Sequence, residues 1–370
     1  NGIEATNELY VKAGSTILNT TATNKGIWMQ DPSAKANTGK LVVEEGAHVD
    51  DVYLDVTEGS TEWPVEVSVA ASSLNEGKTV IYENVPAGYE VVEVGGVWKV
   101  IKSELWELVS TADELAEAIT ANKSVIFAND IEQVDGVLIT DKNITIDLNG
   151  KTFTVSEGAS TNNRNFKING SSKVTIKNGT MIAAGELTSG AYGTVRTDGE
   201  AVVNLETVKL YSYRGYGLNV KANTGTKVNI KDSEIYSQYS GGVEAAGGEI
   251  ELTNVKIEQR GVYSSAAWCS VAIGVNGGGK VTVNSGDYYA AAIATDSNAA
   301  QATWVAYVMS SGGTLDIKGG TFTGVVAETA SAANACGLIC ADRAAVVNIY
   351  DGIFNSNGAI LDMRHNVGTQ

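Results

Sequence analysis

A short pattern of alternating apolar and polar residues recurs eight times in the C-terminal two thirds of this 370-residue chain. Each copy alternates over its first residues and then passes through small or polar residues, as in Val174-Thr-Ile-Lys-Asn-Gly179. Successive copies begin 22 to 34 residues apart, at Ile144, Val174, Val203, Val228, Ile250, Val281, Leu315 and Val347. Such a repeat is typical of a solenoid, in which each unit buries its apolar residues by stacking on its neighbours.

Each copy predicts three short strands. Alternation with a period of two residues predicts the first strand, and pairs such as Asn178-Gly179 favour a sharp bend after it because they tolerate left-handed backbone. A second apolar pair follows the bend, and a third apolar segment, such as Gly217-Leu-Asn-Val220, precedes the next copy. The sequence therefore predicts an all-β protein, a right-handed parallel β-helix of about eight coils. The alternative is an antiparallel sandwich, although sandwich strands do not repeat one register eight times.

Residues 111–120 predict a helix that caps the first coil. Thr111 and Glu114 have the spacing of a capping box, and Leu115, Ala116 and Ile119 share one face at helical spacing. A cap is expected because the first coil would otherwise leave an open sheet edge. We therefore place a capped β-helix at residues 107–370. Residues 1–106 predict a small β domain, or the end of a preceding β-helix, which finishes in a hairpin over residues 88–101.

The charge and composition narrow the classes of partner. With 26 basic and 43 acidic residues, the formal net charge is −17, which repels phosphate backbones and argues against nucleic acid. The sequence contains no apolar stretch of about 18 residues that would insert into a membrane, and its first residues lack the pattern of a signal peptide. An acidic surface rich in Thr, Asn, Gly and Tyr favours an extracellular or cell-surface location. Two histidines and three cysteines favour a protein with no metal and no organic cofactor.

The segment Asp141-Lys-Asn-Ile-Thr-Ile-Asp-Leu-Asn-Gly-Lys-Thr-Phe153, placed after a predicted cap helix, resembles the pectin-lyase-like superfamily of right-handed parallel β-helices. The resemblance runs from Ser110 to Gln370 and is greatest to repeat-rich surface proteins of gut bacteria. It implies the fold more than an activity, because one fold hosts many functions. The polygalacturonase-like members of this superfamily carry Asn-Thr-Asp, Asp-Asp, Gly-His-Gly and Arg-Ile-Lys motifs, and none of these occurs between Ser110 and Gln370.

Aromatic and arginine residues near the second strands favour a binding module. Equivalent positions on stacked coils lie about 4.8 Å apart, so these side chains would form a ladder on which sugar rings could stack. The interpretation is an extracellular binding or structural module that faces a polysaccharide or glycan. Inward-pointing tyrosines that only close the core are the alternative. The candidate ligand-binding residues are Tyr211, Tyr213, Arg214, Tyr216, Tyr236, Tyr239, Arg260, Tyr263 and Trp268.

A polysaccharide lyase or glycoside hydrolase is a second interpretation. Glycosidases need two carboxylates about 5–9.5 Å apart, and acidic residues two coils apart meet that spacing. The catalytic candidates are Asp198, Glu200 and Glu244, with Arg196 as a base or a group that binds uronate. Acidic residues that only solvate turns give the same pattern, so our first interpretation assigns no catalytic residue.

A phage tailspike, fibre or other virion structural protein is a third interpretation, because such proteins resemble this fold and are modular. The copy that begins at Val347 is followed by the start of another strand and by no capping helix. An uncapped coil exposes apolar residues and unpaired backbone. We therefore expect further domains of a longer chain, or oligomer partners, at the C-terminal end.

Overall fold

The computed structural model divides into two compact units, residues 1–108 and residues 109–370, and each is described here by itself. The structure describes residues 3–5, 8–18, 26–30, 39–55, 65–83, 89–102, 105–156, 164–184, 194–213, 215–221, 225–238, 241–260, 270–291, 303–325 and 337–363. Among these residues, no helix is long and apolar enough to span a membrane.

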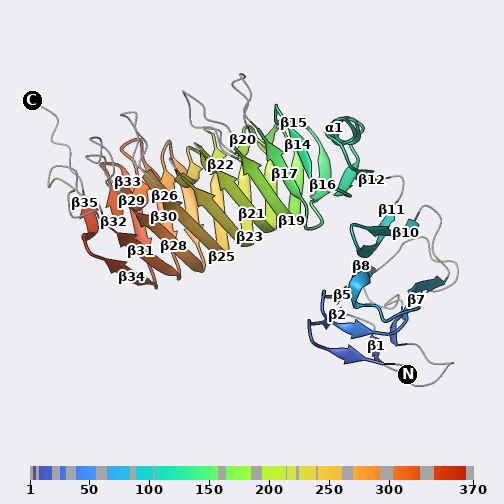
Figure 1. The fold of residues 1–370 in the computed structure, drawn as a ribbon. Helices are drawn as coiled ribbons and strands as arrows, with labels where there is room; N and C mark the ends of the chain where they lie inside the picture. Colours follow the sequence, from blue (N-terminus) through green and yellow to red (C-terminus); the bar gives the residue numbers. More distant parts are fainter. Residues whose placement is uncertain are drawn as a thin grey trace, which may run out of the picture. The chain divides into compact units, whose positions relative to one another are not determined.

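The first unit is built mainly from parallel strands that stack as in a short solenoid (Figure 1). Its core includes Leu41, Val49, Leu54 and Val69, all buried. One sheet has the order β1 (Ile3–Ala5), β4 (Ile27–Gln30), β7 (Val52–Asp55) and β9 (Val80–Glu83). The second has the order β10 (Tyr89–Val94), β11 (Val97–Lys102), β8 (Val65–Ala70), β5 (Gly39–Val43) and β2 (Glu8–Val11). A two-stranded sheet pairs β3 (Thr16–Ile17) with β6 (His48–Val49), and a 3-10 turn, η1 (Ala71–Ser73), follows β8.

The predicted hairpin is confirmed, because β10 and β11 pair antiparallel, with Val94 opposite Val97 across the Gly95-Gly96 turn. By contrast, β2, β5 and β8 pair parallel, as do β4, β7 and β9. The unit therefore has the stacking of a β-helix and is closed by a hairpin.

The second unit begins with strand β12 (Trp106–Val109) and the capping helix α1 (Ala112–Thr120). The capping box is present, since the Thr111 hydroxyl accepts from the Glu114 N–H at 3.3 Å and the Glu114 carboxylate accepts from the Thr111 N–H at 3.2 Å. Leu115, Ala118 and Ile119 are the buried residues of the helix. The prediction that Ala116 shares this face was wrong, because Ala116 is exposed and Ala118, three residues after Leu115, takes its place.

The remainder of the unit is a parallel β-solenoid whose coils stack from α1 to the C-terminal strand (Figure 1). Pairing between successive coils is parallel, which confirms the β-helix and excludes the antiparallel sandwich. The strands that open each coil are β13 (Ser124–Phe127), β16 (Asn143–Asp147), β19 (Lys173–Ala183), β21 (Val202–Ser212), β23 (Lys227–Ser237), β25 (Glu249–Arg260), β27 (Gly279–Val283), β30 (Gly313–Ile317) and β33 (Ala345–Ile349). Separate second strands are β14 (Ile131–Gln133), β17 (Thr152–Val155), β28 (Gly286–Ala291), β31 (Thr321–Val325) and β34 (Ile353–Ser356).

The third strands form a nine-stranded sheet, which gives about nine coils where the repeats predicted about eight. The extra coil contains β13 and precedes the first copy of the repeat. The strands of this sheet are β15 (Val137–Thr140), β18 (Phe166–Asn169), β20 (Val195–Thr197), β22 (Tyr216–Val220), β24 (Gly241–Ala245), β26 (Ser270–Val275), β29 (Thr303–Val308), β32 (Gly337–Ala341) and β35 (Ala359–Met363).

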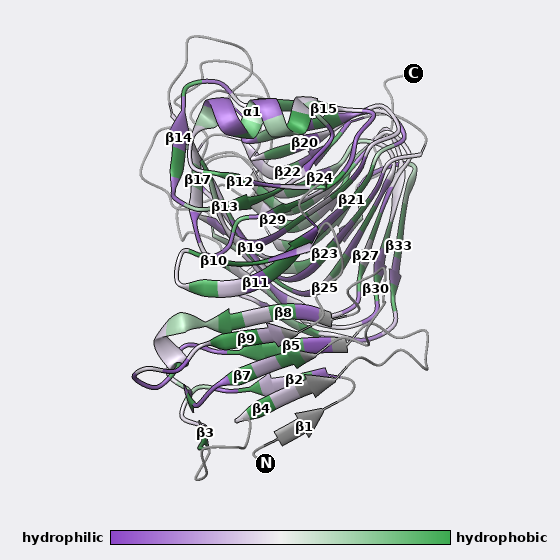
Figure 2. Cartoon of the chain, turned by 90° about the vertical axis from the view of Figure 1, so that its right-hand side faces the viewer, coloured by the Kyte–Doolittle hydropathy of each residue, from purple (hydrophilic) through white to green (hydrophobic). Residues whose placement is uncertain are grey.

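Apolar residues alternate with polar ones along the strands (Figure 2) and point into one continuous core. Phe127, Phe153 and Phe166 are fully buried and contact one another edge-on or tilted, with ring centroids 6.0 and 5.0 Å apart. Tyr288, Phe322 and Phe354 pair between successive coils and form an inward stack, with centroids 4.9 and 5.2 Å apart. Rows of like side chains along the axis follow directly from the parallel register.

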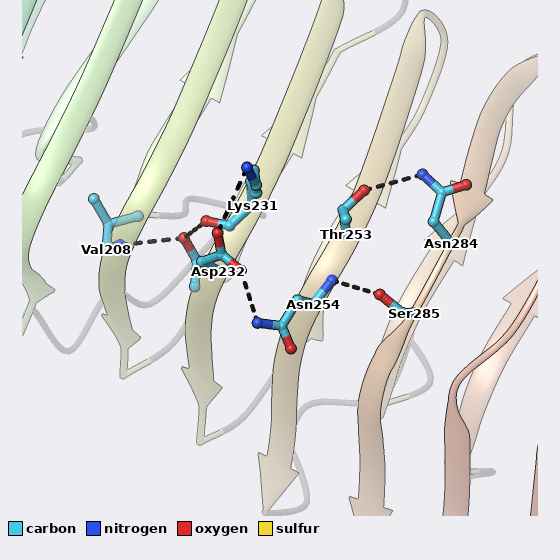
Figure 3. A network of polar contacts seen from close by, with 8 residues as sticks. Val208, Lys231, Asp232, Thr253, Asn254, Asn284 and Ser285 are labelled. Carbon is cyan, nitrogen blue, oxygen red and sulfur yellow. Dashed lines mark hydrogen bonds and ion pairs between the residues drawn. The ribbon is translucent and has the colours of Figure 1, made fainter. Parts of the chain in front are cut away.

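In the middle coils, the predicted first and second strands are joined into one long strand that bends at a residue with left-handed backbone. These residues are Asn178, Thr207, Asp232 and Asn254, with φ between 50° and 59°. The bends contact one another between coils, because the Asn254 amide donates to Asp232 at 2.7 Å and the Asn254 N–H donates to the Ser285 hydroxyl at 2.9 Å (Figure 3). Polar side chains thus link neighbouring coils at the bend, where the backbone ladder is interrupted.

The last described coil exposes several apolar side chains. Tyr350 and Met363 are each 70% exposed, and Val346, Ile349, Ile353, Ile360 and Leu361 are also exposed. The expected partner at this end stays a prediction.

Candidate functional site

The candidate site is a groove on the outside of the solenoid, where the second halves of β19, β21, β23 and β25 lie side by side. Its volume is about 470 Å³. Most of the lining is apolar or uncharged. The lining residues are Ile182, Ala183, Ala184, Tyr211, Ser212, Tyr213, Tyr236, Ser237, Gln238 and Glu258.

One row of paired residues runs along this groove. Ile182 pairs with Tyr211, Tyr211 with Tyr236, and Tyr236 with Glu258. Strands lie about 4.8 Å apart, so the row extends about 14 Å along the solenoid axis. The groove is therefore elongated across four coils, as a chain-like ligand requires.

Two tyrosine rings form the aromatic centre of the groove. The rings of Tyr211 and Tyr236 are stacked, with centroids 4.9 Å apart and an angle of 9° between their planes. Tyr211 is 38% exposed and Tyr236 is half-buried. Stacked aromatic rings with exposed edges offer apolar surface beside hydroxyl groups.

A network of charged residues holds Tyr236 in place. Its hydroxyl donates to the Glu234 carboxylate, which also pairs with Lys209 at 3.3 Å. The bond to Glu234 raises the pKa of Tyr236 to about 12, and the same bond, helped by Lys209, lowers the pKa of Glu234. The phenol therefore stays protonated and keeps its donated hydrogen bond at neutral pH.

Among the described residues that line the groove, Glu258 is the one charged side chain. Its carboxylate binds the Lys256 ammonium at 2.7 Å, and this bond raises the pKa of Lys256. The same ammonium lies 5.7 Å from the centre of the Tyr236 ring. Lys256 is thus engaged by a carboxylate and an aromatic face of the protein itself.

The predicted ligand-binding residues separate into three groups. Tyr211, Tyr213 and Tyr236 are brought together in the groove. Tyr216 is not, because it is only 3% exposed and packs with Val271, Trp304 and Cys340 in a separate buried cluster. The third group lies outside the part of the chain that the structure describes. It contains Arg214, Tyr239, Tyr263, Trp268 and the side chain of Arg260.

The burial of Tyr216 depends on a glycine in the next coil. A Cβ atom at Gly241 would lie 2.4 Å from the Tyr216 ring. The absence of a side chain at Gly241 therefore leaves room for the Tyr216 ring. Sequence alternation alone could not show this.

The sequence analysis missed the charged partners Lys209, Glu234, Lys256 and Glu258. A signal for Glu258 was present, because it follows Tyr236 by 22 residues and Tyr236 follows Tyr211 by 25. These are also the spacings between the repeats that begin at Val203, Val228 and Ile250. The repeat register therefore placed Glu258 on the tyrosine row.

The catalytic candidates lie away from this groove, on the nine-stranded sheet of third strands and in the turns that follow its strands. Arg196, on β20, approaches Asp198 with its Nε at 3.4 Å, and Lys167 lies 3.9 Å from the same carboxylate oxygen. Glu200 is exposed in the turn that follows. Glu244 lies on β24, two strands from β20 and so about 10 Å along the axis.

Glu244 is enclosed by amide groups. It is 7% exposed, and its carboxylate accepts hydrogen bonds from the Asn219 amide and, at 2.9 Å, from the Asn276 amide. Burial raises the pKa of Glu244, and the two amide donors partly oppose that effect. Asp198 is instead paired with cations, so the two carboxyls have different environments.

We expect Glu244 to make stability depend on pH. The pKa of Glu244 is raised in the folded state. The contribution of this carboxyl to the free energy of unfolding is therefore fully present below the ordinary carboxyl pKa and is lost as the pH rises through the pKa of the folded state. As the pH rises from about 4 to about 7, the wild type should lose stability relative to Glu244→Gln. Urea denaturation at several pH values measures this, with the exposed Glu200→Gln as the matched control. A pH-independent difference between wild type and Glu244→Gln would contradict the assignment.

Within the described part of the chain, no three His, Cys, Asp or Glu side chains gather to hold a metal ion. The expected absence of a cofactor stays a prediction.

Comparison with known proteins identifies no family. No family model matches the chain, and no curated protein matches it. Among solved structures, the chain is similar to the crystal structure of the Dettilon tailspike protein, with 12% sequence identity and a TM-score of 0.23. The match covers 68% of this chain and 64% of the tailspike chain, so this chain spans less than two thirds of that protein. A score this low carries no argument, and the fold assignment rests on the strand pairing described above. The pectin-lyase-like resemblance stays a prediction.

Proposed function

We propose that the protein is an extracellular or cell-surface module that binds a polysaccharide or glycan through the Tyr211–Tyr236 groove. The observation that carries the proposal is the stacked tyrosine pair on the floor of an elongated, mainly uncharged groove. Sugars present apolar ring faces that pack on aromatic side chains and hydroxyls that bond to polar groups. The exposed Gln238 amide and the Tyr211 hydroxyl supply such polar groups along the same groove.

The scaffold supports a binding function because most of the groove lies on paired strands, with Ala184, Tyr213 and Gln238 directly after the strand ends. Successive rungs are fixed by the parallel register from Ile182 to Glu258. The Tyr236 ring is further oriented by Glu234 and Lys256. A preformed surface loses little conformational freedom when a ligand binds.

Replacing Tyr211 with alanine should weaken glycan binding at least tenfold, equivalent to about 1.4 kcal/mol, because central aromatic residues dominate binding energy. A glycan array followed by titration of the best-bound polysaccharide measures the effect. Tyr350→Ala is the matched control, since Tyr350 is exposed on the same solenoid but lies outside the groove. Equal affinity of Tyr211→Ala and wild type would contradict the proposal.

The same samples distinguish the other functions. A product assay on the bound polysaccharide should detect no cleavage. Unsaturated or shortened products that disappear in Asp198→Asn or Glu244→Gln would make the protein a lyase or glycosidase. Absence of glycan binding, together with trimers in solution, would favour a virion fibre.

A further inference from the structure

We infer that the Tyr211–Tyr236 groove selects neutral glycans and rejects chains that carry carboxylates, with Glu258 as the residue that determines this specificity. The inference rests on the proposed function and names its ligand class. It follows from where the charges of the groove lie and from which of them are already paired.

Glu258 places a negative charge at one end of the tyrosine row. It pairs with Tyr236 across the sheet and is half-buried in the groove lining. A uronate residue bound at the Tyr236 end of the row would bring a second carboxylate near this one. Like charges held close together in a partly desolvated site repel strongly.

The lysines nearest the row are already engaged by the protein. Lys256 is bound to Glu258 at 2.7 Å and lies against the Tyr236 ring, while Lys209 pairs with Glu234 at 3.3 Å. A ligand carboxylate would have to share one of these ammonium groups with a carboxylate of the protein. A neutral sugar needs no such cation, because the exposed Gln238 amide and the Tyr211 hydroxyl can bond its hydroxyl groups.

The net charge of the chain acts in the same direction. A formal charge of −17 gives a repulsive field for any anionic polymer that approaches. Salt screens this long-range part over about 10 Å at 0.1 M ionic strength. The short-range part from Glu258 should persist at higher salt.

The experiment compares neutral and oxidised forms of one polymer. Mannan, galactan and laminarin are tested for binding to the full chain, and the best-bound polymer is then oxidised at C6 so that hydroxymethyl groups become carboxylates. The wild type should bind the neutral form at least tenfold more tightly. Glu258→Gln should reduce that ratio at least threefold, because it removes the charge and frees Lys256.

Glu206→Gln is the matched control, since Glu206 is an exposed carboxylate on β21 outside the groove. It should leave the ratio unchanged. Equal or tighter binding of the oxidised polymer by the wild type would overturn the inference, as would an unchanged ratio in Glu258→Gln. Binding of the oxidised polymer that is lost in Arg214→Ala would also overturn the inference, because it would show that a cation of the protein binds the ligand carboxylates. Binding of neither form would instead refute the proposed function itself.

Discussion

Replacing Phe153 with alanine should lower the free energy of unfolding of the solenoid by about 3–5 kcal/mol. Phe153 is fully buried, and its ring contacts Phe127 of the preceding coil and Phe166 of its own coil. Each coil is stabilised chiefly by its neighbours. A cavity at Phe153 therefore weakens the packing between the capped end of the solenoid and the coils that follow. Equilibrium urea denaturation of the full chain measures the loss.

Phe153→Leu provides the control for that prediction, since it keeps most of the apolar volume and should cost about 1–2 kcal/mol. A loss below about 1 kcal/mol for the alanine variant would show that the first coils do not depend on this aromatic stack.

Replacing Gly286 with alanine should destabilise the protein by about 2–5 kcal/mol, from backbone strain together with overpacking. Gly286 has φ of +131°, and an added Cβ would lie 2.1 Å from the Val255 carbonyl oxygen. Gly286 starts β28 and pairs with Val255 of β25, so relief of the clash requires the two coils to separate. Urea denaturation and hydrogen exchange of the β28 amides measure the effect.

Gly278→Ala is the matched control, because Gly278 also has left-handed backbone, at φ of +81°, but has open space where a Cβ would be placed. It should cost about 1–2 kcal/mol from backbone strain alone. Equal losses in the two variants would mean that the close approach at Gly286 does not contribute.

The repeat predicted the solenoid in detail. The eight residues that begin the copies, from Ile144 to Val347, pair with one another in a single ladder along the axis. Such accuracy is possible because a one-residue slip would turn every apolar side chain to the wrong face. The choice between Ala116 and Ala118 in α1 was not fixed in this way, since the two residues flank Leu115 and Ile119 at equal angles on opposite sides of the helix, and the helical period does not say which side faces the coil.

The site was predictable only in part. Tyr211 and Tyr236 follow from the repeat register, and the structure places them in one stack. The burial of Tyr216 depends on the absence of a side chain at Gly241, one coil away, and the repeat does not show this. Likewise, the pairing of Lys256 with Glu258 depends on side-chain conformations that the repeat does not specify.

The central claim is that a neutral glycan binds along β19, β21, β23 and β25 at the Tyr211–Tyr236 groove. The most direct test is hydrogen–deuterium exchange of the full chain, with and without the best-bound neutral polymer among mannan, galactan and laminarin. The account predicts that added protection is concentrated at residues 182–184, 211–213, 236–238 and 258 and is absent in Tyr211→Ala. Protection centred on β20 and β24, around Arg196 and Glu244, or on the last coil at β33 to β35, would contradict it.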